Sequence, residues 1–336
     1  MLPGPAMNST NTPGSFAELD LPAFLLKALG EVGYEAPSSI QALTIPPLLA
    51  GRDLVGQAQT GTGKTAAFAL PVLATLDPAS AKPQALVLAP TRELAIQVAE
   101  AFQKYAAHLE GFRVLPIYGG SDYRAQLRTL SRGVQVIVGT PGRVMDHMRR
   151  GSLDLSALRT LVLDEADEML RMGFIDDVEW ILEQTPAERQ IALFSATMPR
   201  EIRRMVGQYM SDPLEVKVNQ TVAVNQNIEH RYALVRHSDK SEAISRFLDL
   251  DPELYGVVFC RTRRDTQALA EELLKRGYRA DALHGEMSQA QRDRVMLRFK
   301  QKHLQVLVAT DVAARGIDVD NLTHVFHHSL PGEAAQ

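Results

Sequence analysis

Two pairs of neighbouring residues carry side chains suited to phosphate chemistry: Lys64 with Thr65, and Asp164 with Glu165. Lys64 and Thr65 follow the glycine-rich residues 58–63, which come after an apolar run and precede an apolar helical pattern. Strand, glycine-rich loop, Gly-Lys-Thr and helix, in this order, predict a phosphate-binding loop. In such a loop the backbone N–H groups, the lysine and the helix N-terminus hold phosphates, and the Thr hydroxyl holds Mg²⁺.

The loop departs from the strict pattern at Ala58, which stands where the first glycine is expected. Gly61 and Gly63 still allow backbone N–H groups to approach phosphate oxygens closely, since neither residue has a Cβ. A Gly/Thr-rich turn that caps an ordinary helix is the alternative. The order of the elements favours nucleotide binding, with the contact residues Ala58, Gln59, Thr60, Gly61, Thr62, Gly63, Lys64 and Thr65.

The carboxylates Asp164 and Glu165 directly follow the apolar run 160–163. An Asp at such a strand end can hold Mg²⁺, and the adjacent Glu can orient and deprotonate an attacking water. An acidic helix N-terminus stabilised by the helix dipole is the alternative, and it accounts for one carboxylate better than for the quartet 164–167. Lys64, Asp164 and Glu165 are therefore the predicted catalytic residues.

The elements that must position these residues alternate along the chain as strands and helices. Apolar runs at 85–89, 114–118, 134–138, 160–163 and 191–194 predict a parallel sheet in an α/β fold. Each run ends in Gly, Thr, Arg or a carboxylate, and ligands in such folds gather at the carboxyl ends of the strands.

A second alternating set follows, without a phosphate loop of its own. Its predicted strands are 230–235, 256–260, 279–282, 305–309 and 323–327. We therefore expect a disordered tail at 1–15, a first domain at 16–217, a linker at 218–227 and a second domain at 228–336.

The amino-acid composition limits the kinds of protein that this chain can be. Hydrophobic residues make up 45% of the 336 residues and charged residues 23%, which is typical of a globular protein. The net charge of −4 gives no global positive field for nucleic acid, although a basic groove can hide in a balanced total. Cys260 is the only cysteine, lies in an apolar run and is expected to be buried. Neither a membrane span nor a signal peptide is recognisable, so we expect a cytoplasmic protein.

Three residues upstream of the loop could read the nucleotide base. An aromatic ring at Phe16 or Tyr34 can stack on adenine, and the Gln41 amide has both a donor and an acceptor for the base edge. Core packing is the alternative for each of them.

The quartet Asp-Glu-Ala-Asp at 164–167 and the motifs around it resemble those of the DEAD-box RNA helicases. This resemblance covers residues 16–336 and implies two tandem RecA-like domains that use ATP and Mg²⁺ and bind RNA, mainly through its sugar-phosphate backbone. It implies adenine contacts from Phe16, Tyr34 and Gln41, further nucleotide contacts from Gly316 and Asp318, and coupling through Asp167, Ser195 and Thr197. The implied RNA contacts are Thr91, Arg92, Gly119, Gly120, Thr140, Gly142, Arg143, Thr262, Gln289, Arg292 and Thr310.

The family pattern continues into a His-Arg…Gly-Arg…Arg motif that this sequence does not reach. We therefore expect a second domain that is incomplete, and a monomer that binds ATP but hydrolyses it poorly, because such arginines contribute about 10³–10⁵ in rate. Two other functions stay open: a non-catalytic, ATP-dependent RNA clamp or annealing scaffold, and a DNA-directed motor or another phosphate-loop NTPase.

Overall fold

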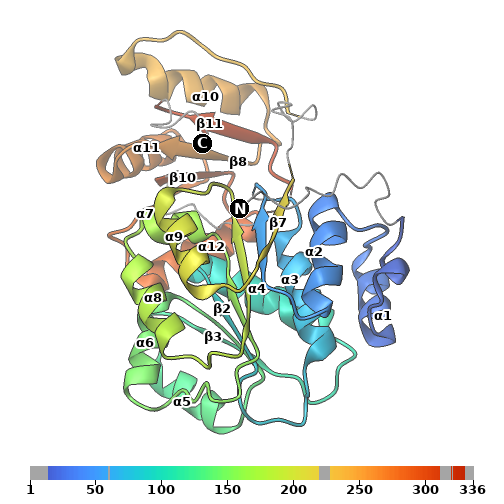
Figure 1. Cartoon of the computed structure of the whole chain (residues 1–336). Coiled ribbons are helices and arrows are strands. Elements are labelled where there is room, and N and C mark those ends of the chain that lie inside the picture. Colours follow the sequence, from blue (N-terminus) through green and yellow to red (C-terminus); the bar gives the residue numbers. More distant parts are fainter. Residues whose placement is uncertain (1–13, 60, 219–227, 311–318, 320, 330–336) are drawn as a thin grey trace. The chain divides into compact units, whose positions relative to one another are not determined.

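The computed structural model describes residues 14–59, 61–218, 228–310, 319 and 321–329 (Figure 1). The chain forms two compact units, Met1–Ala223 and Val224–Gln336. The predicted tail, except residues 14 and 15, and the predicted linker, except Val218, lie outside the described residues.

The first unit is an α/β unit built on a seven-stranded sheet whose paired strands are all parallel, in the order β3-β4-β2-β5-β6-β1-β7. Its strands are β1 (Leu54–Gln57), β2 (Ala85–Leu88), β3 (Val114–Ile117), β4 (Val136–Gly139), β5 (Thr160–Leu163), β6 (Gln190–Ser195) and β7 (Leu214–Lys217). Its helices are the 3₁₀-helix η1 (Phe16–Leu19), α1 (Ala23–Val32), α2 (Ser39–Leu49), α3 (Lys64–Thr75), α4 (Arg92–Tyr105), α5 (Tyr123–Ser131), α6 (Pro141–Arg149), α7 (Ala166–Arg171), α8 (Ile175–Glu183) and α9 (Arg200–Tyr209).

Both faces of this sheet are covered, which explains why its strands are continuously apolar. Successive side chains of a strand point to opposite faces, so Val87 of β2 enters one core and Leu88 the other. The first core contains side chains from η1 and α1 to α4, centred on Phe68, Phe102 and Phe194. The second contains side chains from α6 to α9.

The second unit contains a four-stranded parallel sheet of order β11-β8-β10-β9. Its elements are η2 (His237–Asp239), α10 (Lys240–Leu250), β8 (Gly256–Cys260), α11 (Arg263–Lys275), β9 (Ala280–Leu283), α12 (Gln289–Lys300), β10 (Val306–Thr310) and β11 (His324–His327). Helices α10 and α11 pack on one face of the sheet and α12 on the other. Cys260 is 1% exposed, as expected.

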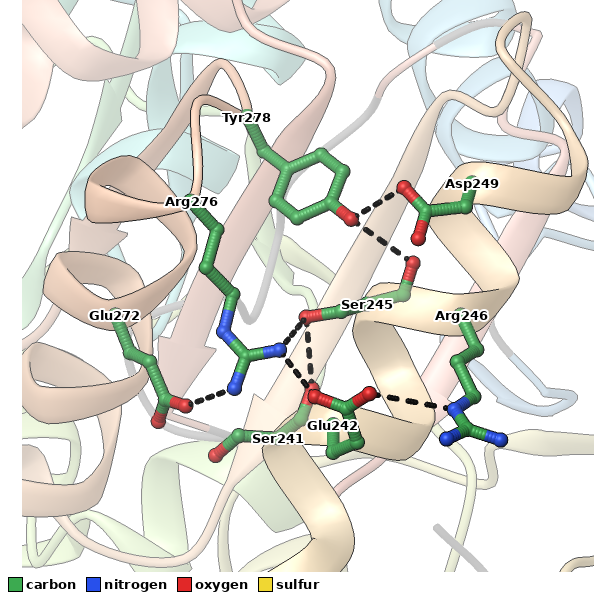
Figure 2. A network of polar contacts seen from close by, with 8 residues as sticks. All are labelled: Ser241, Glu242, Ser245, Arg246, Asp249, Glu272, Arg276 and Tyr278. Atoms are coloured by element: carbon green, nitrogen blue, oxygen red, sulfur yellow. Dashed lines mark hydrogen bonds and ion pairs between the residues drawn. The ribbon is translucent and has the colours of Figure 1, made fainter.

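A polar network joins α10 to α11 and to the turn before β9 (Figure 2). The Arg276 guanidinium contacts Glu242 at 2.5 Å and Glu272 at 2.8 Å, and the Tyr278 hydroxyl donates to Asp249 at 2.5 Å. These contacts fix the two helices on the same face of the sheet.

The predicted strand at 230–235 is wrong. Residues 229–236 lie in an extended, exposed segment outside any sheet, with Tyr232 91% and Leu234 93% exposed. A strand requires a neighbour for its backbone N–H and C=O groups, and no described strand pairs with this segment. Among the described residues, no helix is long and apolar enough to cross a lipid bilayer.

Candidate active site

The phosphate loop joins β1 to α3 at the carboxyl end of the first sheet. Gly63 has φ +91° and Gly61 has φ +79°, a backbone region that glycine enters without strain. Within the described residues, no side chain caps the first turn of α3, so its N–H groups remain available for an anion. Lys64, the first residue of α3, is 6% exposed. Thr60 lies outside the described residues.

Gln41 connects this loop to α2. Its side-chain amide donates to the Gly63 carbonyl at 3.1 Å, and its amide oxygen accepts from the Ser38 backbone N–H at 2.8 Å. The Ser38 hydroxyl donates to the Thr62 carbonyl at 2.8 Å. The residue predicted to read adenine is thus held against the residues predicted to bind phosphate.

The two predicted aromatic contacts occupy different environments. Phe16 is 5% exposed and belongs to the first core, as the core-packing alternative describes. Tyr34 is 39% exposed, stacks on the Phe16 ring at 6.2 Å, and has its hydroxyl 3.2 Å from that of Tyr105. An adenine contact by either ring stays a prediction.

Asp164 and Glu165 occupy the turn between β5 and α7. Asp164 is 2% exposed, and its Oδ1 has no hydrogen-bond partner among the described residues. Glu165 has φ 52° and ψ 53°, a left-handed conformation that a Glu rarely adopts. This backbone strain is typical of functional sites.

Burial sets the protonation of both carboxyls. It raises the pKa of Asp164, while the Lys64 ammonium opposes that rise. Burial, followed by the neighbouring Asp164 charge, raises the pKa of Glu165 to about 7. A carboxyl with a pKa near neutrality is suited to take a proton from water at physiological pH.

These residues fit a Mg²⁺ ion that arrives with a nucleotide. The ion usually binds through one or two carboxylates together with phosphates and waters. The unpartnered Asp164 Oδ1 supplies a buried oxygen ligand of that kind, and the Thr65 hydroxyl stands one residue after Lys64 in the first turn of α3.

Asp167, Ser195 and Thr197 form one hydrogen-bonded cluster between β6 and α7. The Asp167 carboxylate accepts from the Thr197 backbone N–H at 2.9 Å and from its hydroxyl at 2.7 Å. Burial alone would raise the pKa of Asp167, but hydrogen bonds from Thr197 and Ser195 outweigh it and keep that pKa below its ordinary value. The three predicted coupling residues are therefore in contact.

The predicted RNA contacts of the first unit lie after β2, β3 and β4, which are neighbours in the sheet. Thr91 caps α4 by accepting from the Leu94 N–H at 3.2 Å. The Arg92 guanidinium lies against the next loop, so closely that a Cβ on Gly120 would come within 2.7 Å of its Nη1. The sheet thus brings residues 91–92 and 119–120 together.

The third loop, after β4, contains Thr140, Gly142 and Arg143. Thr140 is the N-cap of α6 and Gly142 lies in its first turn. The Arg143 guanidinium donates to the Gln126 amide oxygen at 3.0 Å and lies 5.5 Å from the centre of the Tyr123 ring.

In the second unit, the predicted RNA contacts lie at the carboxyl ends of β8 and β10 and in the first turn of α12. Thr262 caps α11 by accepting from the Asp265 N–H at 3.1 Å, and Thr310 ends the adjacent strand. Gln289 and Arg292 begin α12, and the Gln289 amide donates to Asp293 at 2.7 Å. Gly316 and Asp318 lie outside the described residues.

Three residues of this region were not predicted: Ser38, Gln126 and His147. Ser38 stands three residues before Gln41, the spacing at which an N-cap side chain and a following Gln pair, so the sequence did contain that signal. Gln126 and His147 had no such signal, because their partners come from different elements.

Two family models match the chain. The model described as DEAD/DEAH box helicase matches residues 38–205, and the helicase conserved C-terminal domain matches residues 239–336. The ATP-dependent RNA helicase DeaD of Mycobacterium tuberculosis H37Rv is 52% identical over 327 residues, 97% of this chain and 58% of the relative. That of Escherichia coli K12 is 52% identical over 317 residues, 94% of this chain and 50% of the relative. The chain thus spans between half and three fifths of these relatives.

Solved structures agree with these matches. A DEAD box protein from the hyperthermophile Methanococcus jannaschii is 44% identical with a TM-score of 0.59, over 94% of this chain and 85% of that one. Saccharomyces cerevisiae Dbp5, bound to RNA and ADP BeF3, is 33% identical with a TM-score of 0.86, over 96% of this chain and 82% of that one. Both sheets, the motifs at their strand ends and both family models lead to one conclusion: this chain belongs to the DEAD-box helicase family.

Proposed function

We propose that this chain is an ATP-dependent RNA helicase core, which binds Mg²⁺-ATP at the carboxyl ends of β1 and β5 and RNA backbone at those of β2, β3 and β4. The observation that carries the proposal is the group formed by buried Lys64, buried Asp164 with its unpartnered oxygen, and strained Glu165. The curated relatives are named ATP-dependent RNA helicases, which supports the same activity.

The roles of the site residues follow from their chemistry. Lys64 and the N–H groups of α3 would bind the β- and γ-phosphates, and Asp164 and Thr65 would hold the Mg²⁺. When bound, the ion would supply positive charge beside the phosphate oxygens. Glu165 orients the attacking water and accepts its proton, and Asp167, with Thr197, links this chemistry to the segment after β6.

The RNA contacts are proposed to be independent of sequence. Thr91, Arg92, Gly119, Gly120, Thr140, Gly142 and Arg143 offer hydroxyl, guanidinium and backbone groups, which suit phosphate and sugar oxygens better than base edges. The Dbp5 structure, which contains RNA and ADP BeF3, supports a partner of this kind. Thr262, Gln289, Arg292 and Thr310 of the second unit are proposed to contact the same RNA.

Phosphate release with and without RNA tests the proposal. We expect the 336-residue chain to bind ATP, and to hydrolyse it faster with single-stranded RNA than with DNA of the same sequence. Lys64→Ala should lose ATP binding, whereas Glu165→Gln should keep ATP binding and lose hydrolysis. Wild-type hydrolysis rates in either variant would disprove the catalytic assignments.

The same experiment separates the helicase from a non-catalytic RNA clamp. A helicase core releases phosphate and the shorter strand of a duplex of about ten base pairs, with a rate that depends on Glu165. A clamp retains RNA in the presence of ATP but releases neither, and Glu165→Gln would leave that retention unchanged. Equal stimulation by DNA and RNA would instead favour a DNA-directed motor.

A further inference from the structure

A buried polar cluster lies behind Arg143, between α5 and α6. It consists of Gln126, which is 5% exposed, His147, which is fully buried, and Ser152. None of these three is a predicted ATP or RNA contact, and burying hydrogen-bonding groups is favourable only when they are paired. We therefore asked what these three polar groups hold in place.

The Gln126 amide connects two of the predicted RNA-contact loops. Its oxygen accepts from Arg143 Nη1 at 3.0 Å. Its nitrogen donates to the Ser121 hydroxyl at 2.6 Å and to the Tyr118 carbonyl at 3.2 Å, the residues that flank Gly119 and Gly120. Because a guanidinium can only donate, the amide oxygen must face Arg143, and the orientation of the amide is fixed.

His147 holds that amide from the other side. Its Nε2 lies 2.9 Å from the same Gln126 oxygen, so Nε2 must carry a proton, since an amide oxygen only accepts. Its Nδ1 lies 2.8 Å from the Ser152 hydroxyl. Burial, followed by the positive charge of Arg143, lowers the pKa of His147, so the neutral ring donates from Nε2 and accepts at Nδ1.

His147 also supports the second group that contacts Arg143. Its ring stacks on Tyr123 with centroids 4.4 Å apart and planes inclined by 13°. The guanidinium groups of Arg143 and Arg150 lie 5.5 and 5.0 Å from the centre of the Tyr123 ring, and the Ser152 hydroxyl lies 3.3 Å from the Tyr123 hydroxyl. Both groups that hold the Arg143 guanidinium, the Gln126 amide and the Tyr123 ring, are thus in contact with His147.

We propose that His147 is a positioning residue for RNA binding, which acts through Gln126 and Tyr123 to fix the Arg143 guanidinium and never touches RNA itself. An Arg side chain has many rotamers, and holding it in one of them before binding removes a cost that RNA binding would otherwise bear. This inference rests on the proposed RNA contact of Arg143. The alternative is a buried histidine that only fills the core.

The two interpretations differ in a double-mutant cycle. We would measure the affinity of the full chain for a fluorescein-labelled ten-nucleotide oligouridylate by anisotropy, with Mg²⁺ and a non-hydrolysable ATP analogue. His147→Leu, which keeps the volume and loses the donor, should weaken RNA binding five- to thirtyfold, whereas His147→Gln, which can donate to the same oxygen, should stay within about threefold of wild type. In an Arg143→Ala background, His147→Leu should have no further effect.

A matched control replaces another buried polar side chain of the same unit with leucine. Gln135 is 3% exposed and donates to the Ser80 carbonyl at 2.6 Å, before the start of β4 and so at the opposite end of that strand from Arg143. Gln135→Leu should lower the unfolding temperature as His147→Leu does, but leave RNA affinity unchanged. Affinity for the ATP analogue should stay within about twofold in every variant.

Three results would overturn the inference. In the first, Arg143→Ala weakens RNA binding but His147→Leu does not. Arg143 would then remain an RNA contact, and His147 would have no part in positioning it. Additive losses in the double variant would show that His147 acts without Arg143. If Arg143→Ala binds RNA like wild type, the proposed RNA contact fails and this inference falls with it. If His147→Leu does not fold, Ser152→Ala takes its place. It should lower RNA affinity two- to fivefold, and unchanged RNA affinity would contradict the inference.

Discussion

The Gln41 side-chain amide donates to the Gly63 carbonyl at 3.1 Å, so a residue predicted to read the base is bonded to the loop predicted to hold the phosphates. A hydrogen bond of this kind is worth about 0.5–1.5 kcal/mol net. The Gln41 amide and the loop are thus coupled by a direct contact.

Gln41→Ala should weaken ATP binding roughly tenfold, which corresponds to the loss of about 1.4 kcal/mol. GTP binding should change much less, because GTP presents a different donor and acceptor pattern to the same amide. Titration calorimetry with both nucleotides measures the two affinities. Ser38→Ala is the control, because its hydroxyl also bonds the loop, at the Thr62 carbonyl. It should weaken ATP and GTP equally, and an equal loss in Gln41→Ala would contradict base reading.

The tight packing at Gly63 gives a second prediction. A Cβ on Gly63 would overlap the Gln41 amide, whereas one on Gly61 would meet no atom within 4 Å among the described residues other than its chain neighbours. Both residues have positive φ, so alanine at either costs about 1–2 kcal/mol from the backbone. Gly63→Ala should cost about 1–3 kcal/mol more, from overpacking.

Urea denaturation without nucleotide measures this difference. In a Gln41→Ala background the amide atoms are gone and only the Ser38 Oγ, 3.1 Å from the added Cβ, stays close, so the difference in free energy of unfolding between the two glycine variants should shrink. An undiminished difference would place the strain elsewhere than at the Gln41 amide.

The sheet order explains what could be predicted at the site and what could not. The apolar runs place most strands to within one or two residues at each end, and at β5 (Thr160–Leu163) the prediction is confirmed to the residue. The chain order, however, gives no indication that β3, β4 and β2 are neighbours and that β5, β6 and β1 continue the same sheet beyond β2. Only the pairing reveals that the predicted RNA loops and the predicted nucleotide residues occupy two adjoining parts of one edge.

Other features depend on tertiary contacts that a local pattern does not contain. Residues 230–235 are strand-like in sequence, yet no described strand pairs with them, so their large apolar side chains stay exposed. The left-handed backbone of Glu165 is imposed by the turn from β5 into α7, because the intrinsic preference of Glu is against it. Gln126 and His147 could not be predicted for the same reason. They lie on different helices, and their roles depend on the hydrogen bond between them.

Gly120 gives a third prediction, because a Cβ there would come within 2.7 Å of Arg92 Nη1. The guanidinium is the end of a flexible side chain and would move aside. Gly120→Ala should therefore weaken RNA binding about three- to tenfold in the anisotropy measurement, as a predicted phosphate contact is displaced. Gly51→Ala is the control, since Gly51 has a similar φ of +77° and open space around it. The two variants should lose similar stability, and equal RNA affinities would contradict the role of Arg92.

The carboxyl pair gives the last prediction. An unfolded chain releases the Glu165 proton near the ordinary pKa of 4.5, whereas burial and Asp164 raise the pKa in the folded protein to about 7. The folded state therefore loses stability as pH rises from 4.5 to 7, by roughly 3 kcal/mol in total. Glu165→Gln, which cannot ionise, should match wild type near pH 4.5 and unfold at a higher temperature at pH 8.

Calorimetric scans from pH 4.5 to 8 measure the difference in unfolding temperature between Glu165→Gln and wild type. That difference should grow with pH and level off above about pH 7, while titrating groups that do not interact with Glu165 affect both proteins alike. Glu110→Gln, at an exposed position, is the control, because it removes the same charge without removing a buried carboxyl. A flat difference for Glu165→Gln would mean that Glu165 ionises as an ordinary carboxyl, and a proton acceptor with a pKa near neutrality would then have to be sought elsewhere in the site.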